Sequence, residues 1–540
     1  MPHIEGQLVD LFSRSIYPAR VQFENGIITQ IQTLDKAPDQ YLLPGFVDAH
    51  VHIESSMLVP SEFARLAVIH GSVGTVSDPH EIANVLGEKG VHFMIENGRQ
   101  VPFKFNFGAP SCVPATTFES AGSVIDADGV RALLELDEVR YLAEMMNYPG
   151  VLFNDPEVMA KLQHAKDLGK VIDGHAPGLR GEKAQQYIDA GISTDHECFT
   201  FEEGLDKIQR GMKIIIREGS AAKNFDALIP LIKDYPDQIL FCSDDKHPDD
   251  LLVGHMDQIV RRALAAGYDL FDVLRAACVH PLAHYGLNIG LLRKHDPADF
   301  IIVDRLSSMQ VLATYIDGQL VAQNGKSLIE SVAIECLNQF NTDEKQATDF
   351  KIPAKEGKLQ VIETYDGALI TGKLTLPPKI ESGFAVSDPS RDLLKIAVVN
   401  RYQNSEPACA FIRNVGLKSG AIASCVGHDS HNIIVVGVDD ESIARAVNLI
   451  IQSKGGISVV GPDFEQALPL PVAGIMSDKD GEQVGQAYSE IDQLARSLGT
   501  QLKAPFMTLS FMALLVIPSL KLSDKGLFDG EAFAFTDLWV

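Results

Sequence analysis

The sequence predicts an α/β protein built on a (β/α)8 barrel, with a small composite β-sandwich domain and a separate C-terminal α/β (α+β) domain. Three observations lead to this prediction. Eight short apolar runs alternate with helical stretches over residues 44–285, hairpin-rich segments flank that region, and a long C-terminal region follows a polar connector at 341–351. A barrel of this kind typically takes about 250 residues. A chain of 540 residues is also too long for a single hydrophobic core.

The segments on either side of the barrel predict one small β-domain, assembled from residues 1–43 and 286–340. In the first segment an Asn25-Gly26 turn separates two apolar-rich runs, which is a strong hairpin signal. The second segment contains strand candidates and a turn of the same kind, at 299–304, 311–316 and Asp317-Gly318. We therefore expect strands from both segments to share one domain.

The middle region, residues 44–285, supplies the barrel. Its first strand candidate follows Pro44-Gly45, and the later ones are 73–78, 103–107, 139–144, 170–175, 192–196, 212–217 and 239–244. In this fold the active site lies at the carboxyl ends of the strands. All of these runs except 103–107 end in His, Asp, Glu or Arg, so the predicted barrel mouth is rich in polar side chains.

The C-terminal region, residues 341–540, is predicted to be a further domain. Residues 395–400 and 432–437 are apolar strand candidates. A helix is expected over 440–452, because the Gly455-Gly456 pair that follows is a helix stop signal.

Composition excludes several classes of function. The net charge of −26 argues against a nucleic-acid partner, because phosphate binding requires a basic face. Seven scattered cysteines form no disulfide framework and indicate the reducing cytoplasm. We find no signal peptide, and the apolar segment 506–520 is too short to span a bilayer, so no membrane partner is expected.

The first barrel strand carries two histidines, His50 and His52. Side chains alternate between the faces of a strand, so both imidazoles and Asp48 project to one side. That spacing allows two neutral nitrogens to meet one metal ion. Two ordinary polar residues on an exposed strand would be the simpler explanation, but the apolar run after Pro44-Gly45 argues against exposure.

Further metal-ligand candidates stand at the ends of later strands. In chain order the full set is His50, His52, Glu144, His175, His196 and Asp244. Taken singly, His175 or His196 could be an ordinary core or loop histidine, because single-motif matches are often false. Because all six candidates stand at the ends of predicted barrel strands, they indicate one metal site above the barrel mouth.

Several long motifs then resemble a known family. They are PGFVDAHVHIESS at 44–56, VSDPHEIANVLG at 76–87, AEMMNYPGV at 143–151, DGHAPG at 173–178, TDHE at 194–197 and SDD at 243–245, with C-terminal matches at 399–402, 427–433 and 469–477. In these residues the sequence resembles the amidohydrolase superfamily and, within it, the adenine deaminase family. The resemblance covers nearly the whole chain.

This resemblance implies a metal-dependent amidohydrolase (TIM) barrel with a binuclear metal centre. His50, His52 and Asp244 would hold one divalent ion, His175 and His196 the other, and Glu144 would bridge them. Mn²⁺ is favoured, with Fe²⁺ and Zn²⁺ as alternatives. Imidazole and carboxylate ligands without thiolate suit all three metals.

The implied reaction is the hydrolytic deamination of adenine to hypoxanthine and ammonia, a hydrolase step of purine metabolism and nucleobase salvage. Its partners are a purine base and water. Asp244 would serve as general base and then general acid, and Glu144 or a neighbouring acid would protonate the ring. Superfamily members commonly self-associate, so a homo-oligomer is expected by analogy.

Other polar residues are candidates for substrate binding or for support of the ligands. Asp78 and Glu81 have the alternative explanation of a helix capping box. Arg217 and Ser220 belong to a segment that lines the base pocket or forms a plain loop. The complete set of such candidates is Asp78, His80, Glu81, Glu197, Arg217, Ser220, Asp245, His428 and His431.

The C-terminal candidates, His428 and His431, belong to a polar cluster before an apolar strand. A turn would account for this cluster. Its density of titratable groups leaves a role at the active site open.

Three alternative functions remain at this stage. One is a cyclic-amide hydrolase of the dihydropyrimidinase or hydantoinase type, and another is a deaminase of a different 6-substituted purine. The motifs at 77–81 and 144–147 favour adenine deamination over ring opening. A metal-binding protein without turnover is disfavoured because Asp244 and Glu144 are both present.

Overall fold

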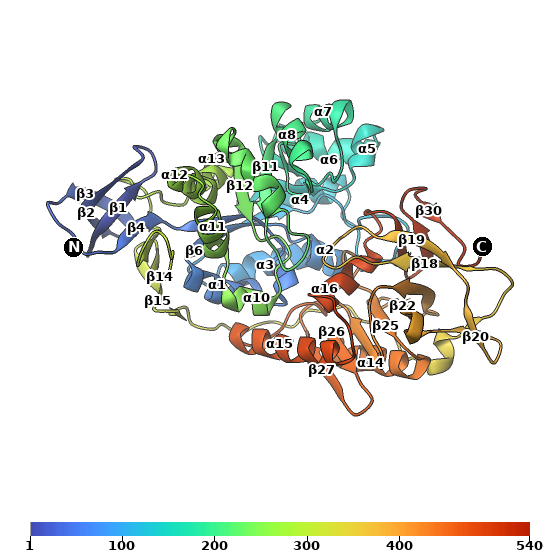
Figure 1. Ribbon diagram of the computed structural model, residues 1–540. Helices are drawn as coiled ribbons and strands as arrows, with labels where there is room; N and C mark the ends of the chain where they lie inside the picture. Colours follow the sequence, from blue (N-terminus) through green and yellow to red (C-terminus); the bar gives the residue numbers. More distant parts are fainter. Residues whose placement is uncertain (1) are drawn as a thin grey trace.

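The computed structural model describes residues 2–540. Its centre is a ring of eight parallel strands, each at a position that the sequence predicts. In Figure 1 this part lies between the N-terminal strands on the left and the C-terminal sheets on the right. The strands are β5 (Phe46–Val51), β6 (Ser72–Ser77), β7 (Lys104–Ala109), β8 (Val139–Met145), β9 (Val171–Gly174), β10 (Thr194–Asp195), β11 (Lys213–Arg217) and β12 (Ile239–Cys242). The predicted (β/α)8 barrel is thereby confirmed.

The barrel consists of two hydrogen-bonded groups of strands, β5 to β9 and β10 to β12. A parallel bridge between Val51 and Asp244 joins β5 to β12. At the other seam, the Ser193 amide donates to the Ile172 carbonyl. The ring therefore closes, and all the carboxyl ends of its strands face one mouth.

Helices cover the outside of the barrel. Before β9 they are α1 (Pro60–Ala67), α2 (His80–Leu86), α3 (Glu88–Gly98), α4 (Ala127–Leu134), α5 (Tyr148–Leu152) and α6 (Pro156–Asp167). After β9 they are α7 (Gly181–Asp189), α8 (Phe201–Gln209), α9 (Phe225–Leu228), α10 (Pro248–Val253), α11 (Met256–Ala265), α12 (Leu270–Leu274) and α13 (His280–Tyr285).

The small β-domain is one sheet built from both ends of the barrel region, in the order β16-β15-β14-β13-β4-β1-β2-β3. The N-terminal strands are β1 (His3–Asp10), β2 (Ser15–Glu24), β3 (Ile27–Thr33) and β4 (Tyr41–Pro44). The later strands are β13 (Phe300–Val303), β14 (Val311–Ile316), β15 (Gln319–Gln323) and β16 (Lys326–Ser327).

This sheet curls over an apolar core. The rings of Phe23 on β2 and Phe300 on β13 lie 5.7 Å apart, although two strands separate β2 from β13 in the sheet. Flat neighbouring strands are about 4.8 Å apart. The expected sandwich therefore takes the form of a single sheet that folds its ends toward each other.

The C-terminal region contains a second eight-stranded sheet, β19-β18-β23-β22-β25-β24-β26-β27. Its strands are β18 (Leu359–Glu363), β19 (Gly372–Leu376), β22 (Leu393–Val399), β23 (Ala408–Arg413), β24 (Ala421–Ser424), β25 (Ile433–Gly437), β26 (Gly456–Val460) and β27 (Glu465–Pro469). Smaller sheets join β17 (Ile352–Pro353), β21 (Phe384–Val386) and β20 (Lys379–Glu381), and β28 (Leu520–Ser523), β29 (Gly526–Asp529) and β30 (Ala534–Phe535).

Helices lie on both faces of this second sheet. One face packs on α14 (Asp440–Ser453), which confirms the helix predicted over 440–452. The other face meets α15 (Gly481–Ser497) and α16 (Pro505–Ser510). Alternate side chains of β25 pack into the hydrophobic clusters on the two faces of the sheet, because successive side chains of a strand point to opposite faces.

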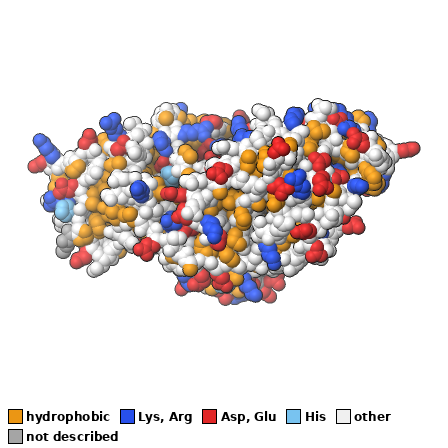
Figure 2. Space-filling view, turned by 90° about the horizontal axis from the view of Figure 1, so that it is seen from below, with side chains coloured by type: hydrophobic (Ala, Val, Ile, Leu, Met, Phe, Trp, Pro, Cys, Tyr) orange, Lys and Arg blue, Asp and Glu red, His pale blue; other side chains and the backbone are white. Residues whose placement is uncertain are grey.

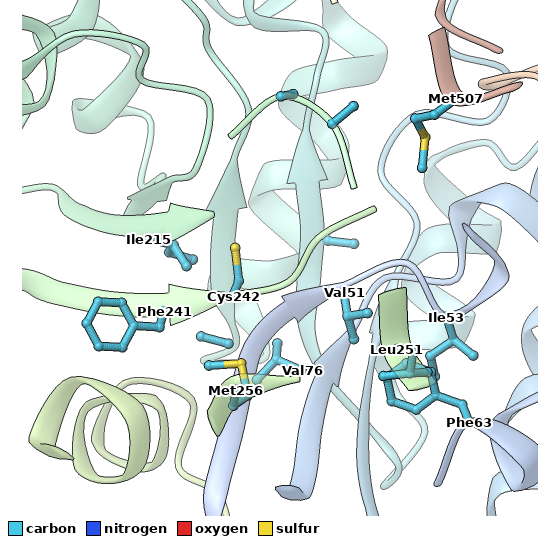
Figure 3. Packing of buried hydrophobic residues seen from close by; sticks show 14 of the residues in the cluster. Val51, Ile53, Phe63, Val76, Ile215, Phe241, Cys242, Leu251, Met256 and Met507 are labelled. Carbon is cyan, nitrogen blue, oxygen red and sulfur yellow. The ribbon is translucent and has the colours of Figure 1, made fainter. Parts of the chain in front are cut away.

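The barrel and the C-terminal region share one hydrophobic core. Met507 of α16 belongs to the same cluster of buried side chains as Val51 and Phe241 of the barrel (Figure 3). The amide of Ala222, in the loop after β11, also donates to the Gly367 carbonyl of the C-terminal region. The C-terminal region therefore packs directly on the barrel mouth.

Charge of both signs is spread over the face in Figure 2, where acidic and basic side chains are interspersed with hydrophobic ones. Over residues 2–540, no helix combines the length and the apolar character needed to cross a bilayer.

Candidate active site

The six predicted ligands converge at the barrel mouth. They come from the carboxyl ends of β5, β8, β9, β10 and β12, and each is at least nine-tenths buried. Their nitrogen and oxygen atoms form overlapping groups within 4.8 Å of one another. The structure thus brings together His50, His52, Glu144, His175, His196 and Asp244.

Glu144 lies at the centre of this group. Its Oε1 is 3.2 Å from His52 Nε2 and 3.9 Å from His50 Nε2. Its Oε2 is 2.6 Å from His175 Nδ1 and 3.2 Å from His196 Nε2. The two oxygens of one carboxylate therefore face different histidine pairs, which is the geometry that a bridging ligand requires.

The histidines of the first strand also meet the other ligands. His50 and His52 have their Nε2 atoms 3.2 Å apart, as expected for neighbours on one strand face. The His50 ring stacks on His196 at a centroid distance of 4.1 Å. His52 Nδ1 lies 3.2 Å from the Asp78 carbonyl, which orients the ring and leaves Nε2 free to bind a metal.

Asp244 follows β12 with a φ of 52°, in the left-handed region. Aspartate tolerates this conformation better than most residues. Its Oδ1 lies 3.2 Å from His52 Nε2 and its Oδ2 forms an ion pair with Arg217. Burial opposes ionisation, but Arg217, His52 and His196 hold the pKa of Asp244 well below its usual value.

The site fits divalent metal ions. It offers four imidazoles and two carboxylates, the donor types that Mn²⁺, Fe²⁺ and Zn²⁺ accept. Burial again opposes ionisation at Glu144, yet His175 and His196 hold its pKa well below the usual range. Both carboxylates are therefore ready to bind cations.

Asp78 and His80 support the ligands. Asp78 accepts hydrogen bonds from the amide of His80 at 3.0 Å, and its Oδ2 is 3.0 Å from His80 Nδ1. His80 Nδ1 in turn lies 3.6 Å from Glu144 Oε1. The alternative of a capping box with Glu81 is wrong, because among the amides at the start of α2 Asp78 accepts only from that of His80, and Glu81 contacts other residues.

Glu81 connects the barrel to the C-terminal region. Its carboxylate contacts His428 Nδ1, and its Oε2 is 2.5 Å from His431 Nε2. The Gly427 amide donates to His431 Nδ1 at 3.3 Å, so Nε2 is the ring nitrogen that faces Glu81. The C-terminal histidines therefore belong to the site and are more than a surface turn.

Arg217 connects three carboxylates. It contacts Glu197 and Asp244 through Nη1, and its Nη2 is 3.3 Å from Asp245 Oδ2. Arg217, Glu197 and Asp245 all line the cavity. Ser220 does not line the cavity: its hydroxyl donates to Asp250 at 2.5 Å, and its amide donates to the carbonyl of Asp245, which does line it.

A narrow cavity lies directly above the ligands. Its floor and walls are polar, whereas Leu369, Phe511 and Leu514 cover it with apolar side chains. These three residues, called the roof below, all come from the C-terminal region. Their position at the cavity was not predicted from the sequence, and neither was that of Asp429 and Met146, which also line it.

Nothing in the sequence distinguishes the roof residues from ordinary core residues. Asp429 had a usable signal, because it lies between His428 and His431 in a matched motif. Its Oδ1 lies 3.5 Å from His80 Nε2.

Comparisons with known proteins agree with this site. The Amidohydrolase family model matches residues 41–321, and the Adenine deaminase C-terminal domain model matches residues 368–534. The first match and the buried ligand cluster together establish a divalent metal centre.

Curated relatives extend the similarity over the full length. The chain is 56% identical over 539 residues to a protein named adenine deaminase from Salinibacter ruber, and the alignment covers 99% of each chain. It is 57% identical over 535 residues to one of the same name from a Sulfurovum species, again with 99% of each chain covered. The adenine deaminase of Methanosarcina mazei is 52% identical, with the same coverage of both chains. The family model over the barrel and these relatives show that the chain belongs to the adenine deaminase family of amidohydrolases.

Proposed function

We propose that this protein hydrolyses adenine to hypoxanthine and ammonia. The observation that carries the proposal is the position of Glu144, whose two oxygens face two histidine pairs beneath an apolar roof. The relatives named adenine deaminase support the same reaction. The reaction belongs to purine metabolism, where it would serve nucleobase salvage.

The ligand assignment is part of the proposal. His50, His52 and Asp244 would hold one divalent ion, His175 and His196 the other, and Glu144 would contact both. Two such ions supply a hydroxide nucleophile at neutral pH. We favour Mn²⁺ over Fe²⁺ and Zn²⁺ on the strength of the family resemblance.

The protein's own residues would move the protons. Asp244 stands at the edge of the cavity, and Arg217 keeps its carboxylate ionised. It can accept a proton from the attacking water and deliver it to the departing amino group, as general base and then general acid. Glu144 or another acid of the site would protonate the ring nitrogen next to C6.

The side chains that line the cavity have the chemistry to bind a flat base. The roof would pack on a face of the purine ring, while polar groups on Glu81, Asp245 and His428 would reach its edges. Burial of flat apolar faces contributes affinity, and a few polar contacts fix the orientation. Asp78 would hold the ligands in place, whereas His80 also lines the cavity and would be within reach of the base.

Wider features of the protein are also proposed here. Domain boundaries after residues 43, 285 and 340 are supported by the two eight-stranded sheets that flank the barrel. A cytoplasmic location is supported by the absence of disulfides among the seven cysteines of the described chain. The net charge of −26 argues against nucleic acid as a partner, and self-association is proposed by analogy with the superfamily.

A substrate panel with metal analysis on the same sample tests the proposed reaction. Adenine should release ammonia, whereas dihydropyrimidines and hydantoins should remain intact. Other 6-substituted purines should react more slowly than adenine. Ring opening of a cyclic amide without ammonia release from adenine would overturn the proposal.

A further inference from the structure

The roof of the cavity consists of two segments that are far apart in the sequence. Leu369 lies between β18 and β19, whereas Phe511 and Leu514 follow α16 near the end of the chain. All three side chains are at least nine-tenths buried and line the cavity. Phe511 also stacks on His428, with ring centroids 5.4 Å apart. The position of the roof therefore depends on what holds the two segments together.

Lys521 on β28 makes that connection. Its side chain is fully buried, and Nζ donates to the Leu369 carbonyl at 2.6 Å and to the Phe511 carbonyl at 2.9 Å. The Phe511 carbonyl also accepts a bond from the Leu514 amide. One amino group thus holds the backbone of both roof segments.

A second tie lies beside the first. The Thr371 hydroxyl donates to the Leu520 carbonyl at 2.8 Å, and the Thr371 amide donates to the Pro518 carbonyl. The strand that carries Lys521 is therefore fixed against the segment that carries Leu369. Lys521 extends this connection across to Phe511.

The surroundings of Lys521 are unusual for a lysine. Within residues 2–540, no carboxylate pairs with its amino group, and burial lowers its pKa to about 7. Burying an amine in this way is costly, and an apolar side chain would avoid the cost. An apolar side chain could not hold the two carbonyls, however, so the position of the roof explains why a lysine stands here.

We propose that Lys521 is a positioning residue that sets the roof against the base and thereby determines affinity for planar heteroaromatic rings. The proposal rests on the proposed function, because it takes this cavity as the place where the base binds. Lys521 does not line the cavity and would act through Leu369, Phe511 and Leu514. A small displacement of those side chains would weaken contact with the faces of the ring and leave the metal ligands in place.

The test is Lys521→Met, which keeps the length of the side chain and removes the donor. Loss of two hydrogen bonds should raise KM for adenine about tenfold. The kcat should stay within about threefold, because the ligands and Asp244 are untouched. Metal content should be unchanged, and the inhibition constant of hypoxanthine should rise with KM.

Two further variants complete the experiment. Lys521→Gln retains a two-donor amide on a shorter side chain and should raise KM less than Lys521→Met. Lys479→Met, at a lysine whose side chain is 66% exposed, is the matched control and should behave as wild type. If Lys521→Met fails to fold, Lys521→Gln carries the test.

Three results would overturn the proposal. In a folded Lys521 variant these are an unchanged KM, a fall in kcat at constant KM, or loss of metal. Failure of the proposed function is separate, because wild-type protein would then release no ammonia from adenine. In that case the dissociation constant of hypoxanthine, measured by calorimetry on metal-loaded wild type and variant, still decides the role of Lys521.

Discussion

The floor and the roof of the cavity are built in opposite ways. The floor consists of six polar ligands at the ends of barrel strands, where backbone hydrogen bonds to neighbouring strands fix each side chain. The roof consists of apolar residues from loops of another region, and Lys521 fixes it through their carbonyls. We infer that the floor provides the chemistry and the roof provides recognition of the base. The four predictions that follow test this division, from the largest expected effect to the smallest.

Removing the metal should abolish turnover at the floor while leaving binding of the base by the roof largely intact. Chelation should reduce adenine deamination below detection, and Mn²⁺ should restore it, because no other group in the cavity generates a strong nucleophile at neutral pH. Hypoxanthine affinity should change by about tenfold or less, because the roof remains. The measurements are ammonia release and calorimetry on the same apo-protein. Full turnover in protein shown to be metal-free would contradict this division.

Asp244→Asn should disable proton transfer at the floor. An amide can still coordinate a metal but has no basic form near neutral pH, so kcat should fall by about 10²–10⁴-fold. The kcat/KM should fall by a similar factor, since the lost interaction belongs to the transition state. Steady-state kinetics with metal content on the same sample measure both. Asp226→Asn, at an 85% exposed carboxylate, is the control. A metal-replete variant within a few-fold of wild type would assign the proton to another acid, Glu144 or Glu197.

The contact of Glu81 with His428 and His431 joins the floor region to the roof region. Glu81→Gln and His431→Ala should each lower kcat/KM by about 10–100-fold, as for other groups that orient catalytic residues. Because the two residues act through one contact, the double variant should lose little more than either single variant. A double-mutant cycle of kcat/KM measures this coupling. Additive losses would mean that the two residues act independently.

The smallest effect concerns stability. The pKa of Lys521 is about 7 in the folded protein, against 10.5 for an ordinary lysine. Between these values the unfolded chain binds more protons, so the penalty of burying Lys521 is complete below about pH 7 and fades as pH rises toward 10.5.

Wild type should therefore gain stability relative to Lys521→Met between pH 7 and 9, by about 2 kcal/mol. Urea unfolding of both proteins at the two pH values gives the difference. A constant difference would show that the amine is already charged when buried.

The floor could be predicted from sequence because its signals are local. His50 and His52 project to the same side because alternate residues of a strand share a face. His175 and Asp244 are expected at the same mouth because the carboxyl ends of all the barrel strands meet there. His196 can also be placed, although β10 is only two residues long, because the run 192–196 reads as one of the eight strand candidates.

The roof could not be predicted because its signals are not local. Leu369 and Phe511 resemble any buried apolar residue, and nothing near either one in the sequence indicates that they meet. Ser220 illustrates the same limit within the barrel, because the path of a loop depends on its tertiary contacts with Asp250 and His247.

The order of these residues in the chain has a consequence for biosynthesis. A ribosome makes all eight barrel strands and every proposed ligand long before Phe511, Leu514 and Lys521 emerge. Domains generally fold from the N-terminus during synthesis. A chain whose synthesis stopped between these two regions would therefore contain every proposed metal ligand and lack the proposed roof.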